Sequence, residues 1–241
     1  MWKKYIGLRY RVEVSTEKQL QEAIALPQIE YVYAPMSIVG SQSSVADCII
    51  VPPVFIGNDE PKMLMRLREL REMGYTRGLA HTIGHIPVIR EAGMTVHGGF
   101  RLNITNSAAL NQYEDLGLAD TILSVEISLN RVKSLKSAIP TGLVVYGKLP
   151  MMLLRNPGIW KSGVQALVDR KGKSFLLKQV NGAGEAELLN PNTLVLSDRM
   201  REFSELDFAV LSIPPGESVK KILSLYLNGE SPKGNFTRGL Y

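Results

Sequence analysis

Hydrophobic positions recur along this chain with two alternating periods, which predicts strands and helices in regular succession. Residues 8–14 (LRYRVEV) alternate apolar and polar side chains at period two, as a half-buried strand does. Short apolar segments predict further strands at 29–34, 48–51, 76–80, 94–97, 121–125, 142–146, 193–196 and 208–213. Alternatively, the strand at 94–97 is expected to continue through residues 100–103.

The sequence predicts helices between these strands. Thr16 followed by Gln19 resembles a capping box, and an apolar stripe of helical spacing follows it. Asp59 and Pro61 predict the start of the next helix, which is expected to stop at Gly74. Further helices are expected to end near Gly93 and Gly117 and to span 129–135.

From residue 76 onward, strand follows strand at intervals of about twenty residues with a helix between them. This order predicts parallel strands covered by helices. About eight core strands favour a TIM-like β/α barrel over an open, doubly wound sheet. No Gly-x-Gly-x-x-Gly turn follows any strand, which disfavours dinucleotide binding. We expect one barrel domain over residues 1–241, with the C-terminal portion of a longer protein as the alternative.

One segment interrupts this rhythm. Residues 166–168, a turn at 170–172 and residues 174–180 predict a β-hairpin inserted after the strand at 142–146. The insertion near 150–180 is basic. Loops inserted at the C-terminal ends of barrel strands are where such folds place function.

Positive charge is concentrated in the same insertion. The chain has a net charge of +5, and residues 148–178 carry seven basic side chains against Asp169 alone. A basic loop on a near-neutral body indicates a surface for a polyanion such as RNA. A solvated hairpin with basic residues on its wet face is the alternative. The candidate nucleic-acid contacts are Lys161, Arg170, Lys171 and Lys173.

Composition excludes several classes of protein and several kinds of site. The apolar runs are too short to cross a bilayer and no signal peptide opens the chain, so we expect a cytoplasmic protein without a membrane partner. Cys48 is the only cysteine, which excludes an intrachain disulfide and a cysteine-rich metal site. His81 and His85 lie four apart but lack the glutamate of an H-E-x-x-H motif, so no metal site is expected.

The candidate catalytic residues lie where strands give way to loops. His97 precedes two glycines that would let a ligand approach the backbone, and it is a general acid/base or a structural histidine. Glu126 follows the strand at 121–125 and would position substrate or pair with Arg101. Tyr146 ends an apolar strand, where its hydroxyl would reach the barrel mouth or its ring would only pack.

The candidate substrate-binding residues are Arg101, Asn103, Asn106 and Lys148. Arg101 alternates with Asn103 on one face of the extended strand and could pair with a carboxylate substrate. Asn106 would also make a good helix N-cap.

Several segments together resemble a known family. HGGFRLNITNSAAL, LGLADTILSVEISL, LVVYGKLPMM, DRKG and FTRGLY are similar, in this order, to the collagenase-like peptidase family U32. The resemblance is to the C-terminal barrel region of its long members, which include RNA cytidine-hydroxylation enzymes. It implies a β/α barrel, an RNA partner and a small anionic metabolite such as prephenate, which would suit Arg101.

The chain departs from that family in one respect. Members with a reported iron–sulfur cluster carry cysteines after the YGxLP strand, and this chain has none there. A four-iron cluster needs about four thiolates. We therefore expect no cofactor in this chain, with a cluster elsewhere in a full-length protein as the remaining option.

Three hypotheses of function follow. The first is the substrate- and RNA-recognition part of an RNA-modifying hydroxylation protein. The second is a U32-type peptidase that activates water with His97 or Glu126, because no Gly-x-Ser-x-Gly nucleophile motif occurs. The third is a non-catalytic interaction barrel. The oligomeric state is not predicted.

Overall fold

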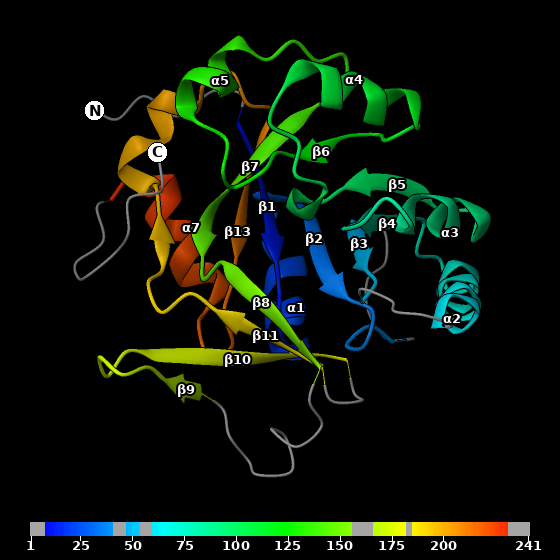
Figure 1. Cartoon of the computed structure of the whole chain (residues 1–241), viewed down its shortest axis with the longest axis horizontal. Coiled ribbons are helices and arrows are strands. Elements are labelled where there is room, and N and C mark those ends of the chain that lie inside the picture. The colour runs from blue at the N-terminus through cyan, green and yellow to red at the C-terminus, as the bar shows by residue number, and fades with distance from the viewer. Residues whose placement is uncertain (1–7, 41–46, 54–58, 156–165, 182–184, 231–241) are drawn as a thin grey trace.

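The computed structural model describes residues 8–40, 47–53, 59–155, 166–181 and 185–230. Eight parallel strands form a closed barrel, because β7 pairs with both β6 and β13 and every other strand pairs with its neighbour (Figure 1). The predicted TIM-like barrel is confirmed. Its strands are β1 (Arg9–Glu13), β2 (Ile29–Pro35), β3 (Cys48–Val51), β4 (Arg77–Ala80), β5 (Thr95–Gly98), β6 (Thr121–Ile122), β7 (Thr141–Gly147) and β13 (Phe208–Ser212).

Helices lie outside the barrel (Figure 1). They are α1 (Glu17–Ile24), α2 (Glu60–Glu72), α3 (His85–Glu91), α4 (Ser107–Asp115), α5 (Leu129–Ser134) and α7 (Val219–Asn228). Side-chain caps fix several starts: Thr16 accepts a hydrogen bond from the Gln19 amide, and Ser218 accepts one from the Lys221 amide. In the described part of the chain, no helix combines the length and apolar character needed to span a bilayer.

The insertion after β7 is a second, antiparallel sheet of four strands in the order β8-β11-β10-β9. The strands are β8 (Pro150–Arg155), β9 (Ala166–Val168), β10 (Ser174–Asn181) and β11 (Glu185–Leu189). The predicted hairpin is β9 and β10, and the Asp169 carboxylate accepts the backbone N–H groups of Lys171 and Lys173 at its turn. The insertion is larger than the predicted hairpin, because β8 and β11 pair with each other and extend it.

Two strand predictions are corrected. The strand expected at 193–196 is β12 (Leu194–Val195), which pairs antiparallel with the end of β7 and lies outside the closed ring of eight. Residues 100–103 do not continue β5: Phe100–Leu102 is a single 3₁₀ turn, and Asn103 ends it with a left-handed φ of 55°. The short polar side chain of asparagine tolerates this conformation better than most residues do.

The barrel interior contains a buried polar network. The Arg11 guanidinium is 1% exposed and pairs with Asp120 at 2.8 Å and with Glu30 at 2.6 Å. It also contacts the Tyr33 hydroxyl and lies over the rings of Phe208 and Tyr31, whose centroids are 3.5 and 4.8 Å away. A buried charge is tolerated only when it is paired and hydrogen-bonded in this way.

Candidate functional site

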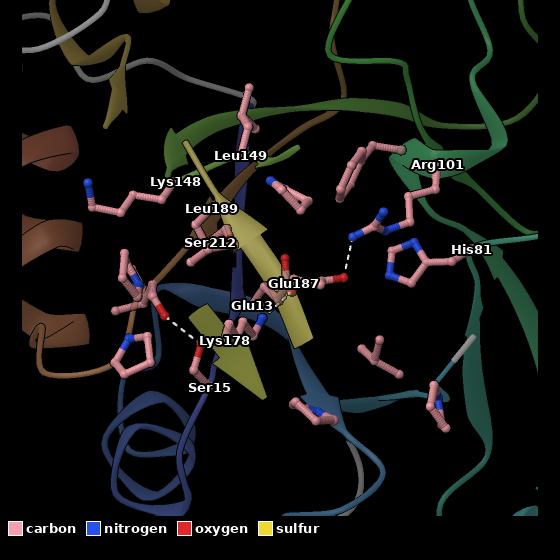
Figure 2. A pocket seen from close by; sticks show the side chains of 18 of the residues that line it. Glu13, Ser15, His81, Arg101, Lys148, Leu149, Lys178, Glu187, Leu189 and Ser212 are labelled. Carbon is pink, nitrogen blue, oxygen red and sulfur yellow. Dashed lines mark hydrogen bonds and ion pairs between the residues drawn. The ribbon is translucent and has the colours of Figure 1, made fainter. Parts of the chain in front are cut away.

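A cavity of about 230 Å³ lies between the C-terminal ends of the barrel strands and the inserted sheet. Polar side chains enter it from both sides: Glu13, His81, Arg101 and Ser212 from the barrel, and Lys178 and Glu187 from the sheet (Figure 2). Its apolar wall includes Met36, Val51, Phe100, Val144, Leu189 and Ile213. The inserted sheet therefore forms the roof of a pocket at the mouth of the barrel.

Two ion pairs connect the barrel to this roof. Arg101 binds Glu187 of β11, and Lys178 of β10 lies 3.5 Å from the Glu13 carboxylate (Figure 2). Lys178 and Glu187 are direct cross-strand partners, so the four charges alternate in sign. Burial alone would raise the pKa of Glu13, but nearby Lys178 and a hydrogen bond with Ser212 hold it below its ordinary value.

His81 follows β4 and contributes a neutral imidazole. Burial, with the Arg101 charge beside it, lowers the pKa of His81 to about 3. Its Nδ1 is buried and has no hydrogen-bond partner among the described residues. Its ring packs edge-on against Phe100, with the centroids 5.6 Å apart. The ring therefore gives the pocket wall a polar group that carries no charge near neutral pH.

Lys148 lines the pocket beside the sheet and donates to the carbonyl of Pro191. Burial lowers the pKa of Lys148, and nearby Glu217 opposes that effect. Together with Arg101, it is one of the predicted substrate-binding residues that the structure brings into the pocket.

His97 is not among the residues that line the pocket. It is 3% exposed in β5, and its Nδ1 lies 2.9 Å from Asp120 Oδ1 in the buried network. The following glycines make room for protein rather than for a ligand. A Cβ at Gly98 would lie 2.3 Å from Thr121 Oγ1, and one at Gly99 would lie 2.4 Å from His81 Nδ1.

Tyr146 also lies away from the pocket lining. The pairing of β7 with β13 skips one residue, since Val210 opposes Val144 and Leu211 opposes Tyr146. Val144 lines the pocket, whereas Tyr146 packs against Tyr226 of α7 and donates to the Glu217 carboxylate. Burial and the Glu217 charge raise the pKa of Tyr146 above its ordinary value.

Three other candidate side chains lie on the surface around the barrel mouth. Glu126 is exposed, and Arg101 pairs with Glu187 rather than with Glu126. Asn103 leaves the expected strand face and accepts a hydrogen bond from Ser124 at 2.6 Å. Asn106 caps α4 by accepting from the Ala109 amide at 2.8 Å, as the capping interpretation predicted.

The basic insertion divides into two groups. Arg170, Lys171 and Lys173 are exposed at the turn between β9 and β10 and border a shallow groove. Lys178 instead points back to the pocket and pairs with Glu13. Lys161 lies outside the described residues.

The residues present do not fit an iron–sulfur cluster. Cys48 is buried in β3, where burial raises the pKa of its thiol to about 12, and a cluster needs several thiolates. Nor do three or more His, Cys, Asp or Glu side chains of the described residues gather as metal ligands would.

Sequence reasoning missed several polar residues of the pocket, among them Glu13, His81, Lys178 and Glu187. Glu13 ends the first strand, and His81 follows the fourth, so strand-end position was an available signal. Lys178 and Glu187 gave no such signal. Their place depends on how the inserted sheet folds back over the barrel.

The chain is similar to one protein family and to a solved structure. Residues 48–158 match the model of peptidase family U32. The matched segment of this U32-like barrel runs from β3 to just beyond β8, and it includes His81, Arg101 and Lys148. A solved structure described as the U32 peptidase Mk0906 aligns with 90% of this chain and 97% of its own, at 10% identity and a TM-score of 0.49. No curated protein shows significant similarity to the chain.

Proposed function

We propose that this U32-like barrel is the substrate- and RNA-recognition part of an RNA-modifying hydroxylation protein. In this proposal the pocket binds a small anionic metabolite and the tip of the β9–β10 hairpin binds the RNA backbone. One observation carries it: the sheet that roofs the pocket also presents Arg170, Lys171 and Lys173 to solvent. RNA bound at the tip would thus lie on the element that covers the metabolite.

The charge of the pocket supports an anionic ligand. Four cationic side chains line it, namely Arg66, Arg101, Lys148 and Lys178, against the carboxylates of Glu13 and Glu187. A cavity of about 230 Å³ with an apolar wall suits a carboxylate on a small apolar body, such as prephenate. Arginine binds carboxylates through two parallel hydrogen bonds, which makes Arg101 the expected anchor.

RNA binding is tested by changing Arg170, Lys171 and Lys173 together to Ala. We expect the wild-type protein to bind a structured ribosomal RNA fragment with an affinity that falls steeply as salt is added. In a plot of the logarithm of the binding constant against the logarithm of the salt concentration, the slope of the triple variant should be shallower by about 2–3. Lys18, Lys220 and Lys221 changed to Ala form the matched control, because they remove the same charge from exposed positions on α1 and α7. Equal slopes for the two triple variants, or no binding at low salt, would remove RNA from the proposal.

Peptide hydrolysis is a second candidate, favoured by the match to a peptidase family. It would require water activated by His97 or Glu126, and neither residue lines the pocket. Cleavage of gelatin that is lost in both His97→Ala and Glu126→Ala would support it. A protein that binds neither RNA nor a small anion and cleaves no peptide would support the third option, a non-catalytic interaction barrel.

A further inference from the structure

The anchor proposed for the ligand already has a carboxylate bound to it. Glu187 of the roof occupies the Arg101 guanidinium, and both side chains retain some exposure, 26% for Arg101 and 13% for Glu187. Figure 2 shows the pair spanning the pocket from the barrel side to the sheet side. Glu187 contacts Nη2 of the guanidinium, and a ligand carboxylate bound by two parallel hydrogen bonds would need the same nitrogen.

We propose that Glu187 is a built-in competitor for Arg101, which a carboxylate-bearing ligand must displace when it enters the pocket. This inference rests on the proposed binding of a small anion. It names the residue that limits the affinity of the pocket for that anion. A neutral ligand gains nothing by displacing Glu187, so the pair also selects for charge. An inorganic anion has no apolar body to bury against the pocket wall and therefore competes weakly.

Displaced Glu187 is not left without a counter-ion. Lys178 lies directly across from it on β10, so its ammonium group can replace the guanidinium. Lys178 is in turn held by Glu13 at a distance of 3.5 Å, longer than a tight ion pair. The alternating order of charges therefore allows Glu187 to exchange Arg101 for Lys178, which avoids the large cost of a buried, unpaired carboxylate.

The exchange also couples the pocket to its roof. The Arg101–Glu187 pair and the Lys178–Glu13 pair both join the barrel to the inserted sheet. When a ligand takes Arg101, one of these two connections is lost. Ligand entry is then expected to loosen the β10–β11 hairpin, in contrast to the usual tightening of a protein around its ligand.

The test is calorimetric titration of benzoate and prephenate into wild-type protein and Glu187→Gln. Glutamine keeps the size of the side chain and removes its charge. We expect the variant to bind both carboxylates at least tenfold more tightly, and to show no such gain for benzamide, the neutral counterpart of benzoate. Glu205→Gln is the matched control, because it makes the same chemical change at an exposed residue outside the pocket lining.

The outcomes separate the two proposals. Wild-type binding that Glu187→Gln leaves equal or weaker would overturn the competitor role while the anionic pocket stands. No binding by either protein would overturn both. Glu187→Asp, which retains the charge on a shorter arm, is expected to give an intermediate affinity and serves if Glu187→Gln does not fold. An equal gain for benzamide would mean that the variant only widens the pocket, and it would also overturn the competitor role.

Discussion

Arg101, just after β5, forms an ion pair with Glu187 of the inserted sheet, 86 positions further along the chain. The pair joins the closed barrel to the sheet that roofs its mouth. Arg101 was predicted from the sequence to bind substrate. In the structure it takes part in an ion pair within the protein itself.

Removal of Asp120 is expected to destabilise the barrel strongly. Asp120→Ala would leave the fully buried Arg11 guanidinium with Glu30 as its remaining carboxylate partner and would deprive His97 of its bond. The expected loss is about 3–5 kcal/mol in the free energy of unfolding, measured by urea denaturation. Glu91→Ala, which breaks the exposed pair with Arg68, is the control and should cost less than about 1 kcal/mol. Similar losses in the two variants would contradict the importance of the network.

The same carboxylate should give stability a specific dependence on pH. Burial would raise the pKa of Asp120, but the hydrogen bond with His97 and the Arg11 charge hold it below its ordinary value of 3.8. A lowered pKa in the folded state means that the stabilisation is present above about pH 4 and is lost as the pH falls through the folded pKa. The stability difference between wild type and Asp120→Asn should therefore be constant at neutral pH and shrink in acid. A stability difference that grows in acid would show that the pKa of Asp120 is raised in the folded state.

Tyr146→Phe is expected to affect stability but not ligand binding. The hydroxyl donates to Glu217 beside α7, so its loss should cost about 1 kcal/mol. Because Tyr146 lies outside the pocket lining, the affinity for benzoate should not change. Chemical denaturation and calorimetry on the same sample measure the two quantities. Loss of benzoate binding by a fully folded variant would show that Tyr146 belongs to the binding site.

Gly99→Ala is expected to disturb the pocket through His81. The new methyl group would lie 2.4 Å from His81 Nδ1 and 3.2 Å from the Ala80 carbonyl, so the imidazole must move. Overpacking of this kind typically costs about 1–3 kcal/mol. The expected result is a lower thermal midpoint together with weaker benzoate binding. Gly40→Ala is the control, since, chain neighbours aside, no atom of the described residues lies within 4 Å of the position its methyl group would take.

Much of the fold was predictable because its determinants are local. The period-two pattern at β1, the cap at Thr16 and the apolar stripe of α2 each lie within a few residues, and regular alternation then implied the barrel. The strand expected at 193–196 shows the limit of this reasoning. Its apolar pattern predicted a buried strand, but only pairing could reveal that β12 lies antiparallel to β7.

The candidate site was predictable only in part. Arg101 and Lys148 follow strands and line the pocket, as strand-end reasoning implies. His97 and Tyr146 satisfy the same rule but lie elsewhere. The side chain of His97 points to Asp120, and a skipped residue in β7 turns Tyr146 towards α7. The face of a strand on which a residue lies depends on register, which a single sequence does not give.

By itself, then, the sequence determined the alternating elements, the barrel class and the basic hairpin, since each depends on side chains close together in the chain. The tertiary structure decided how charges are paired. The ion pairs Arg101–Glu187 and Glu13–Lys178 join positions 86 and 165 apart, and they exist only because the inserted sheet folds back over the barrel mouth. Pairing of buried charges depends on distances of a few ångströms between elements, and long-range packing alone sets those distances.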